Sequence, residues 1–95
     1  MIELTESNFN KEVVEYRGKV IIDVWANWYG RCKMIKPTFA QKAIEITNYK
    51  FCTLDADANQ ALCGVLTITN LPTFIIYEDG KEIKRGGAEI INELC

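Results

Sequence analysis

The residues best suited to chemistry in this 95-residue chain are its four cysteines, because the sequence contains no histidine. The absence of histidine excludes Ser-His-Asp and Cys-His catalytic groups and the HExxH type of zinc site. No two cysteines are separated by two residues, so the CxxC spacing of zinc ribbons and dithiol redox sites is absent as well. What remains is the chemistry of single thiols, at Cys32, Cys52, Cys63 and Cys95.

Sequence context favours structural interpretations for three of these cysteines. Cys52 lies in a predicted inner strand, where a free thiol behaves as a small hydrophobic group, so we expect it in the core. Cys63 follows Leu62 and lies off the centre of a predicted helical apolar stripe, which predicts a partly exposed thiol. A role for Cys63 as a substitute partner of Cys32 stays open. Cys95 ends the chain, where a frayed thiol is accessible to oxidation, and it is assigned no function.

Composition predicts one soluble domain over residues 1–95. Hydrophobic residues make up 48% and charged residues 25%, which is ordinary for a globular domain. Eleven Lys and Arg against thirteen Asp and Glu give a net charge of −2, without the basic excess that nucleic-acid binding requires. The apolar runs are shorter than the ~18 residues of a membrane span, and residues 1–6 carry no secretory signal pattern. We therefore expect a cytoplasmic protein with reduced thiols that binds neither nucleic acid nor membrane.

Hydrophobic periodicity predicts strands and helices in alternation, and a hairpin at Asp79-Gly80. The predicted strands are residues 2–4, 20–25, 51–54, 73–77 and 81–85. The predicted helices carry the apolar stripes Phe9/Val13/Val14, Ile35/Phe39/Ala43/Ile46, Ala58/Leu62/Val65 and Ile90/Ile91/Leu94. The order βαβαβαββα is that of an α/β fold with a mixed sheet of about five strands flanked by helices.

The predicted strand over residues 20–25 contains a carboxylate at a position where burial is expected. It is apolar on both faces apart from Asp23, a pattern typical of a central strand that is covered on both sides. Asp23 is therefore predicted to be a buried carboxylate, and Trp25, which alternates inward, is predicted to lie in the core.

Residues 23–37, DVWANWYGRCKMIKP, resemble the active-site segment of the thioredoxin family. That segment runs Asp, Phe, Trp, Ala, any residue, Trp, Cys, Gly, Pro, Cys and Lys. Residues 71–73, Leu-Pro-Thr, are similar to the family's cis-proline segment, Asp79-Gly80 to its hairpin turn, and Gly87 to the glycine before its final helix. The resemblance spans nearly the whole chain and implies the thioredoxin fold.

Two positions depart from the family pattern. Tyr29 stands where the family has its first, attacking cysteine, and Arg31 stands where it usually has proline. Cys32 corresponds to the second, resolving cysteine. The start of a helix and the neighbouring cations lower the pKa of a thiol at this position, whereas its usual burial opposes them, so the reactivity of Cys32 is left open.

The resemblance implies a site built from two kinds of residue. Cys32 and Asp23 are the candidate catalytic residues, since the family's buried aspartate helps to move the proton of the resolving thiol, and burial raises its pKa. An inherited aspartate without a present role is the alternative interpretation. The candidate substrate-binding residues are Trp28, Tyr29, Gly30, Arg31, Leu71 and Pro72.

The function implied by the resemblance is thiol–disulfide exchange through one retained thiol, with weak dithiol reductase activity. The expected partners are protein or peptide thiols and disulfides, with glutathione or a thioredoxin reductase as electron donor, and the expected state is a monomer. The alternative is a redox-inactive module that binds a peptide or protein beside Trp28, Tyr29 and Pro72, so whether the protein is an enzyme stays open. An iron–sulfur cluster needs more ligands than Cys32 offers, and no cofactor or metal is expected.

Overall fold

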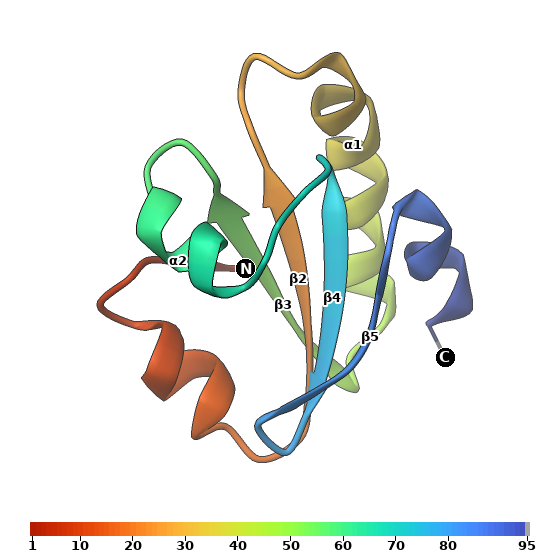
Figure 1. Cartoon of the computed structure of the whole chain (residues 1–95). Helices are drawn as coiled ribbons and strands as arrows, with labels where there is room; N and C mark the ends of the chain where they lie inside the picture. Colours follow the sequence, from red (N-terminus) through yellow and green to blue (C-terminus); the bar gives the residue numbers. More distant parts are fainter. Residues whose placement is uncertain (95) are drawn as a thin grey trace.

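A computed structural model describes residues 1–94, in which five strands form one mixed sheet (Figure 1). In spatial order the strands are β1 (Ile2–Leu4), β3 (Tyr49–Asp55), β2 (Lys19–Trp25), β4 (Thr73–Glu78) and β5 (Lys81–Gly86). Strands β1, β3 and β2 pair in parallel, whereas β2 with β4 and β4 with β5 pair antiparallel. The predicted mixed sheet is confirmed, with β2 in its centre, as the apolar character of both its faces indicated.

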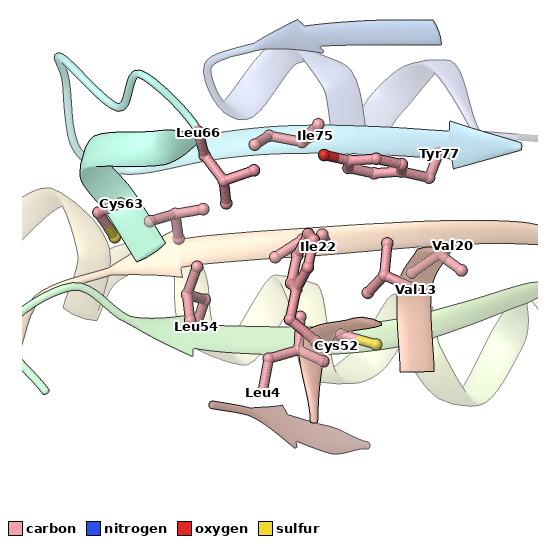
Figure 2. Packing of buried hydrophobic residues seen from close by; sticks show 12 residues of the cluster. Leu4, Val13, Val20, Ile22, Cys52, Leu54, Cys63, Leu66, Ile75 and Tyr77 are labelled. Carbon is pink, nitrogen blue, oxygen red and sulfur yellow. The ribbon is translucent and has the colours of Figure 1, made fainter. Parts of the chain in front are cut away.

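Helices cover both faces of the sheet, and each face has its own apolar cluster. On one face Val20 and Ile22 pack near η1 (Asn10–Val14) and α2 (Gln60–Val65), as Figure 2 shows. On the other face Ile21 packs with residues of α1 (Gly30–Glu45) and of η2 (Ala88–Glu93). Because side chains alternate along a strand, Asp23 points to the same face as Ile21, toward α1.

The predicted order of elements is confirmed, although two helices are not α-helices. The first is a five-residue π-helix and the last a six-residue 3-10 helix. The apolar stripe of α1 lies as predicted, with Phe39 buried and Ile35 packed against its cluster. Within residues 1–94, α1 is the longest helix, with 16 residues, and no helix combines the length and the hydropathy of a membrane span.

The predicted phase of α2 is wrong by one position. Val65, expected on its buried face, is 80% exposed, and Cys63 and Leu66 are buried instead (Figure 2). The prediction of a partly exposed Cys63 thiol is wrong for the same reason. A helix of six residues is too short for its own periodicity to choose a face, so packing against the sheet decides. Val14 of the first stripe is likewise exposed.

Of the two other cysteines, Cys52 lies fully buried in the core, as predicted, whereas Cys95 lies outside the described residues.

The hairpin at Asp79-Gly80 is confirmed, and both residues have positive φ angles. A side chain at Gly80 would place its Cβ 2.3 Å from the carbonyl oxygen of Val14, so only glycine fits this turn.

Candidate active site

The candidate site lies at one end of the sheet, where β2 ends and α1 begins (Figure 1). Val24 of β2 lies opposite Thr73 of β4, so Pro72, which precedes β4, lies at the same edge as the end of β2. The Leu71–Pro72 peptide bond is cis, which confirms the expectation from the resemblance. Gly30, the first residue of α1, is exposed at this edge.

The thiol of Cys32 is almost completely enclosed. Only 1% of the residue is exposed, in the first turn of α1. Burial raises the pKa of the Cys32 thiol, and the nearby Asp23 carboxyl raises it further. A hydrogen bond from the backbone N–H of Ala26 and the charge of Lys36 lower the pKa but do not outweigh burial. Cys32 is therefore less acidic than a free thiol in the resting structure.

Asp23 is a fully buried carboxyl without a hydrogen-bond partner. Neither of its oxygens is bonded to any group of the described residues. Burial raises the pKa of Asp23 to about 7, and the charge of Lys36 lowers it only in part. The burial expected from the sequence is confirmed, and the carboxyl gains or loses its proton near neutral pH.

Lys36 belongs to this site, and the sequence patterns did not single it out. Its ammonium group lies 3.8 Å from the centre of the Trp25 ring, a cation–π geometry. Trp25 is half-buried beneath it, so the prediction of a core position for Trp25 is wrong. The available signal was spacing, because Lys36 follows Cys32 by four residues and so shares its helix face.

Two aromatic side chains form the rim of the site. Trp28 is 66% exposed, and its indole N–H donates a hydrogen bond of 2.8 Å to the Asp57 carboxylate. The Tyr29 ring meets the Trp28 ring edge-on, with ring centres 5.4 Å apart. Asp57 is a further residue that the sequence patterns did not indicate, since 29 positions separate it from Trp28.

A groove of about 710 Å³, here called the main groove, is lined by residues at the start of α1, in the loop before β4 and at the end of β5. It brings four of the candidate binding residues together, namely Tyr29, Arg31, Leu71 and Pro72. A smaller cavity of about 300 Å³ is lined by Trp28, Tyr29, Leu71 and Cys63 among others. Tyr29 and Leu71 thus line both spaces, whereas Cys32 and Gly30 line neither.

Comparison with known proteins identifies the family. A family model described as Thioredoxin matches residues 1–94. The chain belongs to the thioredoxin family. The thioredoxin of Mycobacterium bovis is 32% identical to it over 99 residues, which cover 98% of this chain and 85% of that protein. The thioredoxin of Mycoplasma pneumoniae is 38% identical over 74 residues, 78% of this chain and 72% of that protein.

Another relative joins a thioredoxin to a second activity. The bifunctional thioredoxin reductase/thioredoxin of Mycobacterium leprae is 31% identical over 99 residues, 98% of this chain and 22% of that protein. Members of the thioredoxin family are thiol–disulfide redox proteins, and the five-stranded mixed sheet with its flanking helices is the thioredoxin fold. Among residues 1–94 there is no group of three His, Cys, Asp or Glu side chains arranged to hold a metal ion.

Proposed function

We propose that this thioredoxin-family protein exchanges thiols and disulfides through the single thiol of Cys32, once an extended peptide lies in the main groove. The observation that carries the proposal is the buried Asp23 carboxyl. Burying a carboxyl without a hydrogen-bond partner costs stability and contributes nothing to packing. A carboxyl with a pKa of about 7 beside Cys32 has the property required of a proton acceptor for that thiol.

The exchange proceeds in two displacements. The Cys32 thiol transfers its proton to the Asp23 carboxylate, and the thiolate attacks one sulfur of a bound peptide disulfide. The S–S bond breaks, the departing sulfur takes up a proton as a thiol, and a mixed disulfide joins Cys32 to the peptide. An external thiol such as glutathione then attacks the peptide sulfur, which releases Cys32 and leaves the peptide in a disulfide with the external thiol.

The arrangement around Cys32 limits the rate of this exchange. The thiol is buried, its pKa is raised, and it lines neither cavity. With Tyr29 at the position of the attacking cysteine, the sequence has no second thiol at the CxxC spacing to resolve the mixed disulfide. We therefore expect only weak reduction of protein disulfides by a dithiol route.

A second candidate function is peptide binding without redox turnover. It is favoured by Tyr29, whose phenol lines both cavities and is no substitute for a nucleophilic thiolate. Within residues 1–94 the backbone N–H and C=O of Leu71 make no hydrogen bond, so both are available to pair with an extended chain. The partners we propose for either function are peptide or protein segments, with glutathione or a thioredoxin reductase as electron donor for the first.

Alkylation of the reduced, folded protein, followed at each cysteine by peptide mass spectrometry across a pH series, tests the first function. Cys32 is expected to react more slowly than a free thiol at pH 7 but faster than Cys52, whose burial raises its pKa to about 12. Asp23→Asn removes both the proton acceptor and the charge that raises the pKa of Cys32. It is therefore expected to slow disulfide exchange at Cys32 although the thiol becomes more acidic, and to leave the alkylation of Cys52 unchanged.

Two results would contradict single-thiol exchange. One is a Cys32 rate no faster than that of Cys52, which would mark Cys32 as a core thiol. The other is vigorous insulin reduction by the unmodified protein, which would require a second thiol in the cycle. Peptide binding that persists unchanged in Cys32→Ser, together with the first result, would support the binding function.

A further inference from the structure

We infer that the main groove selects extended peptides with an acidic side chain, and that Arg31 makes this selection. The inference rests on the proposed function, because both of its candidates place an extended peptide in this groove. Arg31 occupies the position where the family usually has proline, so the preference is a property of this chain.

The charges that line the main groove are all positive. Among the described residues, 1–94, the charged residues that line it are Arg31 and Arg85, although the whole chain has a net charge of −2. Arg85 is already occupied, because its guanidinium donates two hydrogen bonds to the Glu82 carboxylate and others to backbone carbonyls before β4. Glu89, which follows the lining residues Gly87 and Ala88 in the sequence, accepts a hydrogen bond from the N–H of Gly87.

Arg31 is the cation of the groove that has no counter-charge. It is exposed, and within residues 1–94 its guanidinium forms no ion pair or hydrogen bond. The first turn of α1 contains no acidic residue, and Tyr29 provides no side-chain cap. The backbone N–H groups of Gly30 and Arg31 are unpaired in the described part of the chain, so the positive end of the helix adds to the same charge.

The rest of the groove suits the remainder of an extended peptide. Met34, which is 81% exposed, forms its apolar wall together with Ile35 and Pro72. Leu71, whose backbone N–H and C=O make no hydrogen bond within residues 1–94, lines the same groove. Because side chains of an extended chain alternate, a peptide that pairs with Leu71 and seats an apolar residue on Met34 directs its neighbouring side chains toward the rim, where Arg31 lies.

Binding of two matched peptides, measured by fluorescence anisotropy, tests the selection. One labelled extended peptide carries a central valine flanked by glutamates, and the other carries glutamines in their place. The intact protein is expected to bind the glutamate peptide about fivefold more tightly at low salt, the upper range for an exposed charge pair. The preference is expected to shrink at high salt, because screening weakens exposed charge pairs.

Three variants test whether Arg31 causes the preference for the glutamate peptide. Arg31→Gln is expected to remove most of it and Arg31→Glu to reverse it. Lys33→Gln removes the same charge two residues away, outside the groove lining, and is expected to keep it. Equal affinity for both peptides, a preference that survives Arg31→Gln, or an equal loss in Lys33→Gln would overturn the selection by Arg31 while leaving groove binding intact. Failure of the intact protein to bind either peptide would overturn groove binding as well.

Discussion

The polar groups at the two ends of the central sheet, the end with the β4–β5 hairpin and the end with the candidate site, differ in their hydrogen bonding (Figure 1). At the hairpin end, the N–H of Gly18 donates to the Asp79 carboxylate at 2.9 Å and the N–H of Asp79 donates back to the carbonyl of Gly18 at 3.0 Å. Arg17 donates to the carbonyl of Asp79, and the Lys50 ammonium is bound by Glu12. At this end the polar side chains and turn amides hold one another in place.

At the site end Trp28 is bound to Asp57, but three other groups have no partners among residues 1–94. The Asp23 carboxyl, the backbone of Leu71 and the guanidinium of Arg31 are all unpaired. Buried polar groups in proteins are usually hydrogen-bonded, and each exception asks for an explanation. The hairpin end is therefore held by paired polar groups, whereas the site end keeps one buried carboxyl and two accessible polar groups unpaired among residues 1–94.

Removing the unpaired carboxyl should give the largest effect. Because the pKa of Asp23 in the folded protein is about 7 and its ordinary value is 3.8, the unfolded chain loses this proton first as pH rises. The folded state therefore loses stability between about pH 4 and pH 7. Asp23→Asn should abolish this loss, with a gain of about 3 to 4 kcal/mol in the free energy of unfolding at pH 8 relative to pH 4.

Urea unfolding of both proteins at several pH values measures this effect. Glu78→Gln, which removes an exposed carboxylate from the end of β4, provides the control and should show no such gain. A stability difference between Asp23→Asn and the parent protein that is the same at pH 4 and pH 8 would show that Asp23 is not the strained group of the site end.

A substitution at the hairpin end should act in the opposite direction. Gly80→Ala should lower the free energy of unfolding by about 2 to 3 kcal/mol, because the φ angle of 84° disfavours a side chain and the new Cβ would meet the carbonyl of Val14. Gly64→Ala, in α2 with open space around the position, should instead raise stability by about 0.5 to 1 kcal/mol. Thermal unfolding of the pair measures both, and equal effects would mean that the turn is not held as described.

The smallest expected effect concerns Lys36, the cation that acts on the buried site within residues 1–94. Lys36 lowers the pKa of both Asp23 and Cys32, so Lys36→Met should raise both pKa values and slow alkylation of Cys32 at pH 7 to 8 by about twofold. Methionine retains a flexible side chain over the Trp25 ring. Lys33→Met, which removes a charge that acts on neither group, should leave the rate unchanged, and faster alkylation in Lys36→Met would contradict the electrostatic role.

Local sequence patterns predicted the order and position of most strands and helices, because apolar runs and turn residues determine these elements. Residues 20–25 are apolar on both faces, and they form the central strand with Asp23 buried. Asp79-Gly80 is a turn in any context, since both residues tolerate a positive φ angle. The same reasoning failed at Val65 and Cys63, where a short helix offered two faces of similar character and docking on the sheet chose between them.

The sequence by itself determined the α/β order, the family, the absence of a CxxC pair and the burial of Asp23, because each depends on residue type and near neighbours. The tertiary structure alone decided that Cys32 is enclosed, that Lys36 lies over Trp25 and that Trp28 binds Asp57. It also decided that Arg31 faces a groove without a carboxylate partner. The physical reason is that accessibility and counter-charge depend on what other segments of the chain bring to a residue, and those segments are remote in the sequence.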